Sequence, residues 1–243
     1  MFAYVGNSRD ELENLVAMLR DSAKRDRIAE TLGMATTTHP DGWGYVVSSE
    51  LGCEVEKFGN DISKETDIKT RLPPTSGGMF AIFHARQATK GTIGESSSQP
   101  FWADDKSDTL FLAHNGSLDM DGMREDLGLT GETDSEMILN YAVRKGLPAA
   151  VTDLWKYVDS NSALNLLVLR RRRDGKDELY ANWHYKKGSP DITKYYEMMY
   201  QHLPHGRVVF SSTLNEYGLN GRTLPQGRLM TASELGTSPI DLP

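Results

Sequence analysis

The chain has 243 residues, of which 27 are basic and 34 acidic, so its formal net charge is −7 at pH 7. This acidic balance argues against a broad surface for nucleic acid or for anionic lipid. Hydrophobic residues make up 38% of the chain, which is enough for a substantial core. The one cysteine, Cys53, excludes an internal disulfide and a cysteine-based zinc site.

No targeting or membrane-spanning segment is recognisable. The sequence contains no run of about 18 apolar residues, and its N-terminus lacks the basic, then apolar, then small-residue pattern of a signal peptide. We therefore expect a cytoplasmic protein that binds no membrane and no nucleic acid, and we expect neither a cofactor nor a metal ion. No linker divides the chain, so residues 1–243 are predicted to form a single α+β domain.

The first quarter of the chain predicts a strand, a helix and a hairpin. Residues 1–6 form a short apolar run closed by glycine, so the α-amino group is expected at the edge of a core. Ser8 opens a capping box, and apolar residues follow it at helical spacing. Residues 39–47 read as a glycine-rich turn entering a strand, with Cys53 on the next strand. Nothing nearby in the sequence would lower the pKa of Cys53, so we interpret it as inert.

Two segments in the middle of the chain, residues 78–91 and 110–116, begin as strands and stop abruptly in polar residues. A buried strand of this kind delivers polar groups to its end. In the first segment these groups are Arg86 and Thr89, and a guanidinium fork with a hydroxyl suits a carboxylate. The alternative is that Arg86 is a surface cation.

The second segment ends in Asn115 and Gly116, which offer an amide side chain and a backbone N–H. Both are donor types that stabilise an oxyanion. The alternative is a hairpin turn, because Asn-Gly after an apolar run commonly forms one. The combination of the two segments favours a functional site.

A second well-marked helix begins after Thr133, which forms a capping box with Glu136, and it stops at Gly146. Asp134 falls in its first turn, where the helix dipole favours a carboxylate by about 0.3 to 1 kcal/mol. That effect alone could explain Asp134. The alternative is that its carboxylate points into a site and pairs with a ligand ammonium.

Further apolar patterns predict one helix and then three strands: 151–158, 163–169, 178–183 and 208–211. The basic run from Arg170 to Arg173 lies before a turn signal, and we interpret it as the solvated tip of a hairpin rather than an RNA-binding patch. Residues 195–200 are ambiguous and compatible with a short helix. Signals after residue 215 are weak.

Several motifs in this order resemble the class II glutamine amidotransferase family, which belongs to the N-terminal-nucleophile hydrolases: Met1–Gly6, Asp41–Gly44, His84–Arg86, His114–Gly116, Thr133–Glu136 and Val209–Ser212. The resemblance runs from residue 1 to about residue 215. It implies a four-layer αββα sandwich in which the site lies between the two sheets, at the strand ends.

The resemblance also implies roles for individual residues. Arg86 and Thr89 would hold the α-carboxylate of glutamine, and Asp134 would pair with its α-ammonium. Asn115 and the backbone N–H of Gly116 would form the oxyanion hole. The histidines of two motifs would be structural, holding strand ends by hydrogen bonds rather than acting as a general base: His84 and His114.

The sequence departs from the family at the nucleophile. The family uses a cysteine directly after the initiator methionine, whose thiolate attacks the amide while its α-amine moves the proton. Aligning Gly6 with the family's first glycine places Phe2 at that position, where no nucleophile exists. The bulk of Phe2 should also prevent removal of the methionine. No Cys, Ser or Thr occurs before Ser8, so a one-residue slip does not restore the nucleophile.

Three interpretations follow. In the favoured one, the protein binds glutamine or a related amino acid without catalysis, as a sensor or as a subunit of a larger complex. In the second, it is an active glutamine amidohydrolase with another attacking group, such as water activated by the Met1 α-amine. In the third, the fold is purely structural and the Phe2 ring fills the site. Any synthetic reaction would also require a separate acceptor protein to receive ammonia.

Overall fold

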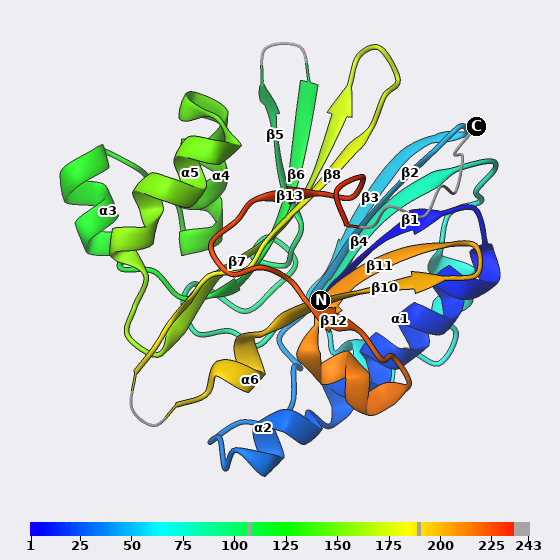
Figure 1. Cartoon of the computed structure of the whole chain (residues 1–243), viewed down its shortest axis with the longest axis horizontal. Helices are drawn as coiled ribbons and strands as arrows, with labels where there is room; N and C mark the ends of the chain where they lie inside the picture. The colour runs from blue at the N-terminus through cyan, green and yellow to red at the C-terminus, as the bar shows by residue number, and fades with distance from the viewer. Residues whose placement is uncertain (106–107, 189–190, 236–243) are drawn as a thin grey trace.

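Two antiparallel sheets form the centre of the computed structural model, which describes residues 1–105, 108–188 and 191–235 (Figure 1). The order of strands in the first sheet is β12 (Arg222–Thr223), β10 (Met198–Leu203), β11 (Gly206–Ser211), β1 (Phe2–Gly6), β4 (Met79–Ala85), β2 (Trp43–Ser49) and β3 (Gly52–Phe58). The order in the second sheet is β13 (Met230–Thr231), β8 (Glu178–Asn182), β7 (Ser162–Arg172), β6 (Asp108–Gly116) and β5 (Phe101–Asp105), and β9 (Tyr185–Lys186) pairs with β7.

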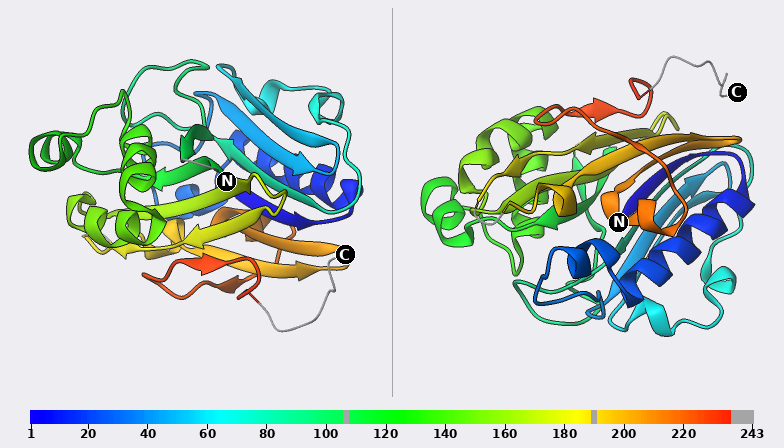
Figure 2. Two further views of the ribbon diagram at one scale, coloured as in Figure 1. Left: turned by 90° about the horizontal axis from the view of Figure 1, so that it is seen from above. Right: turned by 60° about the horizontal axis from the view of Figure 1, so that its bottom comes forward.

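Helices cover the outer faces of the two sheets. The first sheet carries α1 (Arg9–Lys24), with α2 (Arg27–Thr31) beyond its end, whereas α3 (Met120–Leu127), α4 (Asp134–Lys145) and α5 (Leu147–Asp153) lie on the side of the second sheet (Figure 2). The remaining helical segments are the short α6 (Thr193–Tyr196) and the 3₁₀ turns η1 (Ile62–Lys64), η2 (Ile68–Arg71), η3 (Leu154–Tyr157) and η4 (Ser212–Tyr217). Within the described ranges, no helix combines the length and apolar character needed to cross a bilayer.

Three layers of apolar side chains hold these elements together. One lies between α1 and the first sheet and contains Leu12 and Phe83. A central layer between the two sheets contains Ile82 and Leu167. The third lies between the second sheet and α4 and includes Leu166. Because side chains alternate along a strand, Ile82 and Phe83 face opposite layers. The predicted α+β, four-layer αββα sandwich is confirmed, although residues 236–243 of the predicted 1–243 domain lie outside the described residues.

The predicted first helix is confirmed, but only one of the two hydrogen bonds of its predicted capping box is present. Ser8 caps α1 by accepting a hydrogen bond from the Glu11 backbone N–H at 3.2 Å. The Glu11 carboxylate does not return to Ser8; it accepts from the Tyr4 hydroxyl at 2.9 Å and from the His205 backbone N–H at 2.9 Å. The Tyr4 hydroxyl is near enough to accept from the Ser8 N–H itself, at 3.2 Å. The second half of the box is therefore replaced by a contact across the fold.

The arginine run differs from its predicted role. The hairpin of β7 and β8 is present, but Arg170 to Arg172 continue strand β7 instead of forming its tip. Arg170 donates to Asp108 at 2.6 Å, and Arg171 donates to the Ser48 hydroxyl of the first sheet at 2.8 Å. Arg170 and Arg171 therefore tie strands and sheets together, and only Arg173, the last residue of the run, lies in the exposed turn as predicted.

Some helix and strand boundaries differ from those predicted from local sequence patterns. The predicted helix over 151–158 is split between the end of α5 and the turn η3, and the ambiguous stretch over 195–200 is split between α6 and strand β10. Three of the strands that were not predicted, β9, β12 and β13, have two residues each and therefore no alternation to detect. Strand β5 was not predicted either; it lies at the edge of its sheet, and its Trp102 is half-exposed.

Candidate functional site

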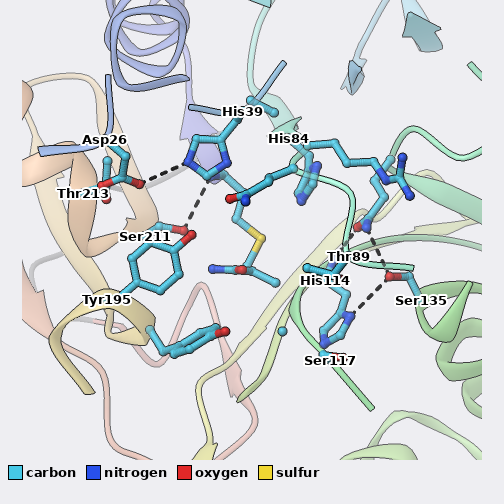
Figure 3. Close-up of a pocket in the computed structure, with 18 of the residues that line it drawn as sticks. Asp26, His39, His84, Thr89, His114, Ser117, Ser135, Tyr195, Ser211 and Thr213 are labelled. Atoms are coloured by element: carbon cyan, nitrogen blue, oxygen red, sulfur yellow. Dashed lines mark hydrogen bonds and ion pairs between the residues drawn. The ribbon is translucent and has the colours of Figure 1, made fainter. Parts of the chain in front are cut away.

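A cavity of about 250 Å³ lies where the strand ends of both sheets meet the start of α4 (Figure 3). Most of the residues singled out in the sequence line it: Arg86, Thr89, Asn115, Gly116 and Asp134. Phe2 does not line it. The fold thus brings together residues that lie up to 48 positions apart in the chain. They meet at the strand ends between the two sheets, where the family resemblance implies the site.

Arg86 is buried at the cavity wall, with 4% of its surface exposed. Its two terminal nitrogens donate to the backbone carbonyls of Lys90 at 2.7 Å and Thr92 at 3.0 Å. Burial lowers the pKa of the guanidinium, while the charges of Asp41 and Asp134 act in the opposite direction. A guanidinium carries five N–H donors, so donors remain for a ligand. The surface-cation interpretation of Arg86 is wrong.

The glycine-rich motif before β2 supports the loop that carries Thr89. Asp41 accepts a hydrogen bond from the Ala88 backbone N–H at 2.8 Å. Gly42 has φ +120°, and a Cβ there would lie 2.2 Å from the Ser98 hydroxyl oxygen, so only glycine fits. Thr89 itself is exposed at the cavity mouth. The motif therefore supports this loop, and its residues Asp41 to Gly44 are not among those that line the cavity.

Asn115 and Gly116 are the last residues of strand β6 and pair with Asn165 and Leu164 of β7. The hairpin-turn interpretation is therefore wrong. Gly116 has φ +148°, and a Cβ there would lie 1.8 Å from the carbonyl oxygen of Ala163. Only glycine permits the two strands to approach this closely at the cavity.

Asp134 is the first residue of α4. The capping box formed by Thr133 and Glu136 on either side of it is complete, as predicted. The Asp134 carboxylate is buried and accepts from the backbone N–H groups of Leu118 at 3.0 Å and Ser135 at 2.8 Å. These bonds fix its position at the cavity wall. A carboxylate offers about four lone-pair sites, so acceptor capacity remains for a ligand cation.

The two histidines expected to be structural differ in their surroundings. His114 contacts the Ser135 hydroxyl at 3.2 Å and the Ala163 carbonyl oxygen at 3.3 Å, which fits a structural role. Burial lowers its pKa, and Asp134 opposes that shift. His84 is also buried, but its Nδ1 has no hydrogen-bond partner among the described residues. Within the described residues, Nδ1 of His84 therefore does not supply the strand-holding hydrogen bond that we expected.

Phe2 lies on the other side of strand β1 from the cavity. Its side chain is fully buried under α1 and stacks on Phe83, with ring centroids 5.1 Å apart. The interpretation in which the Phe2 ring fills the site is therefore wrong. Met1 lines the cavity in its place, and its amino nitrogen lies 3.5 Å from the Ser211 hydroxyl oxygen. Burial lowers the pKa of this amino group to about 5, although Asp26 favours its charged form.

The structure adds a pair that the sequence did not single out, Asp26 and His39. Asp26 caps α2 by accepting from the Ile28 and Ala29 backbone N–H groups, and it accepts from the Thr213 hydroxyl at 2.8 Å. Its other oxygen lies 3.1 Å from His39 Nε2 (Figure 3). Burial alone would raise the pKa of Asp26, but these hydrogen bonds lower it. Aspartate is a common N-cap residue, so the sequence could have indicated Asp26 as the start of a helix. It could not have indicated His39 as the partner of Asp26.

Comparison with known proteins agrees with the fold and the motifs. The sequence model of the class II glutamine amidotransferases matches residues 27–174, which is more than half of the chain. The chain therefore belongs to the class II glutamine amidotransferases. Its nucleophile position and ligand do not follow from this membership.

One curated relative is named "Putative glutamine amidotransferase YafJ", from Escherichia coli (strain K12). It is 28% identical over 145 residues, covering 53% of this chain and 53% of that protein. The match thus spans about half the length of either protein.

Two solved structures share the fold across 95% of this chain. One is the glutamine phosphoribosylpyrophosphate amidotransferase from B. subtilis complexed with ADP and GMP, with TM-score 0.61, 14% identity and 47% of that chain covered. The other is an allosteric regulatory enzyme of purine biosynthesis, with TM-score 0.63, 16% identity and 46% of that chain covered. This chain therefore spans about half the length of these enzymes, and the likeness is one of fold.

Proposed function

We propose that this class II glutamine amidotransferase-like protein binds glutamine or a related amino acid without hydrolysing it, as a sensor or as a subunit of a larger complex. The observation that carries the proposal is the meeting of Arg86 and Asp134 in one cavity that no cysteine lines. The one cysteine of the chain, Cys53, lies on strand β3. In this proposal, the protein keeps the binding half of a glutamine site and lacks the usual attacking group.

The proposed binding mode follows from charge. An α-amino acid carries a carboxylate beside an ammonium, and the cavity offers a guanidinium and a carboxylate that are both buried. Arg86 would hold the α-carboxylate with the help of the Thr89 hydroxyl, and Asp134 would accept from the α-ammonium. Asn115 and the Gly116 N–H would donate to the side-chain carbonyl. Charge-assisted hydrogen bonds to buried groups such as Arg86 and Asp134 are strong enough to hold a small ligand.

Glutamine analogues test the two charged contacts separately. Glutamine is expected to bind in calorimetry. Glutamine amide, which lacks the α-carboxylate, and N-acetylglutamine, which lacks the α-ammonium, should each bind at least about tenfold more weakly. In the Asp134→Asn variant, acetylation should cause no further loss, because the partner of the ammonium is already gone. Absence of binding heat with glutamine, glutamate and asparagine alike would contradict the proposal.

A second function is favoured by the Asp26–His39 pair: hydrolysis of glutamine by a non-cysteine attacking group. His39 contacts Asp26 through Nε2, which leaves its other ring nitrogen to accept a proton from water. The amino group of Met1, whose pKa burial lowers to about 5, is a second candidate base because it is uncharged at neutral pH. Water would attack the amide carbon, the base would take its proton, and ammonia would leave with that proton.

Ammonia release from glutamine tests this second function. If it operates through His39, the His39→Asn variant should lose at least about a hundredfold in rate, the usual contribution of a general base. His205→Asn is the matched control, because His205 is exposed and lies outside the cavity lining. Intact mass would establish which residue carries the free amino group in the sample. A native protein that releases no ammonia above the blank would exclude this function.

A transfer reaction would need one more component. Class II amidotransfer passes ammonia to an acceptor, and we propose that a separate acceptor protein would supply it for this chain. Co-purification alone would not establish such a partner. Glutamine-dependent amination of an acceptor that requires both proteins would do so.

A further inference from the structure

Strand β5 forms the outer edge of the second sheet, and no strand of the described residues pairs with its outer side (Figure 1). Its Trp102 is 50% exposed and lies opposite Phe111 of β6. Phe111 packs in the central layer, so the Trp102 ring is on the face that looks toward the first sheet. Asp104, two positions further on, is exposed on the same face. An unpaired edge that carries an exposed aromatic ring is a template for another strand.

The neighbouring strand β6 shows which backbone groups of β5 are already paired. The N–H of His114 donates at 2.6 Å to the side chain of Gln99, two residues before β5. His114 therefore directs its backbone groups toward β5. Because this direction alternates along an antiparallel strand, Leu112 and Leu110 also direct their N–H and C=O groups toward β5.

These two leucines are the register partners of Phe101 and Ala103, whose backbone groups are therefore used within the sheet. Trp102 and Asp104 alternate with them along β5. Their N–H and C=O groups consequently point away from the sheet, where a further strand would pair with them. The free hydrogen-bonding positions of this edge are thus the same two residues that expose an aromatic ring and a carboxylate.

Lys57 of β3 reaches this edge from the first sheet. Its Nζ lies 4.7 Å from the centroid of the Phe101 ring and 5.5 Å from that of the Trp102 ring. Two glutamates favour its charged form from a distance, but no ion pair of Lys57 is present in the described part of the chain. Burial lowers the pKa of this ammonium, so a further carboxylate beside it would be favourable.

We propose that two copies of this chain associate edge to edge through β5, antiparallel about a twofold axis at Ala103, so that Lys57 of each copy pairs with Asp104 of the other. In this register Trp102 of one copy lies opposite Asp104 of the other, and both offer free backbone groups. An axis at Asp104 would instead place two carboxylates opposite each other. An axis at Trp102 would place Asp104 opposite Pro100, which has no N–H to donate. The edge thus favours one register.

The charges of this edge are self-complementary, which argues for a second copy as the occupant. Each copy contributes one ammonium and one carboxylate, and a twofold axis joins them in two equivalent pairs. The small side chain of Ala103 permits close approach at the axis, where the pair has no hydrogen bonds. The outer strand of the first sheet, β3, differs because its exposed side chains are the carboxylates of Glu54 and Glu56. Charged side chains of this kind protect an edge from pairing.

Sedimentation velocity of the native chain tests the association. The contact is small, so we expect a reversible dimer with a micromolar Kd, whose mass rises from 27.1 kDa toward twice that value between about 1 and 200 µM. Trp102→Lys should weaken it at least about tenfold, because a buried tryptophan commonly dominates an interface. Leu51→Lys is the matched control, because Leu51 is 62% exposed and lies outside β5. A chain that stays monomeric throughout, or an equal loss in both variants, would overturn the proposal.

An exchange of charges tests the register. Lys57→Glu and Asp104→Lys should each dimerise at least about tenfold more weakly, because like charges then meet in both pairs. In an equimolar mixture of the two variants, both pairs again join opposite charges, so a heterodimer of nearly native affinity should form. If the mixture associates no better than the separate variants, the pairing of Lys57 with Asp104 is wrong. Circular dichroism of each variant confirms that it is folded.

Amide hydrogen exchange locates the contact on the backbone. The N–H groups of Trp102 and Asp104 should exchange more slowly as the protein concentration rises. Those of Phe101 and Ala103 should change little, because they are already bonded within the sheet. A dimer that leaves the exchange of Trp102 and Asp104 unchanged would form through another surface, and the proposal would be wrong.

Discussion

Replacement of Arg86 by alanine is expected to weaken amino-acid binding by about a hundredfold or more. Removing one partner of a buried, hydrogen-bonded charge pair costs about 2 to 5 kcal/mol, partly because the other charge is left unpaired. Arg86→Lys keeps the positive charge but loses the planar fork that fits a carboxylate. It should therefore bind more tightly than Arg86→Ala and more weakly than the native protein. Calorimetric titration with glutamine and glutamate gives the three affinities.

The control for Arg86 must separate ligand contact from loop anchoring, because Arg86 also donates to the carbonyls of Lys90 and Thr92. Arg9 makes the same kind of anchor outside the cavity, where its guanidinium donates to the carbonyls of Pro73 and Leu72. Arg9→Ala should leave the affinity for the amino acid within about threefold of native, as expected for a residue remote from the site. Equal losses in the two variants, or none in Arg86→Ala, would contradict the proposed role of Arg86.

The Phe83→Ala variant should lose about 3 to 5 kcal/mol of unfolding free energy, the usual cost of removing a buried aromatic ring. Phe83 is fully buried and stacks on both Phe2 at 5.1 Å and Tyr45 at 5.2 Å between ring centroids. It also lies on β4, the strand that delivers His84 and Arg86 to the cavity. Urea denaturation followed by circular dichroism measures the loss.

Phe80→Ala is the matched control on the same strand. Phe80 is half-buried and faces the other side of β4, so its removal should cost clearly less than that of Phe83. A double-mutant cycle with Phe2→Leu and Phe83→Leu should give a coupling of about 0.5 to 1.5 kcal/mol, as aromatic pairs do. Additive losses would mean that the Phe2 ring does not lie against Phe83, and the possibility that it enters the cavity would reopen.

The elements predicted best are those whose signals are local. The capping box of Thr133 and Glu136 involves neighbouring residues, and the structure contains both of its hydrogen bonds. The strands that deliver Arg86 and Asn115 were visible because a buried run of apolar residues ends abruptly in polar ones. Most of the cavity wall follows from these signals together with the family resemblance.

The parts that could not be predicted depend on distant contacts. Asp26 receives a hydrogen bond from Thr213, 187 positions away, and Glu11 receives one from His205, 194 positions away. No short pattern encodes such pairs. The orientation of Phe2 was equally hidden, because every residue of β1 is buried and such a strand shows no alternation between apolar and polar faces. Only the packed structure shows that Phe2 faces Phe83 while Met1 faces the cavity.

The most direct test of the central claim combines binding and turnover in one sample. Native protein, with its first residue established by intact mass, is titrated with glutamine in a calorimeter, and the recovered solution is assayed for ammonia and glutamate. The account predicts saturable binding at one site per chain, with no ammonia above the blank after prolonged incubation. Catalytic release of ammonia, at more than one equivalent per chain, would contradict it, and so would the absence of binding to glutamine and glutamate.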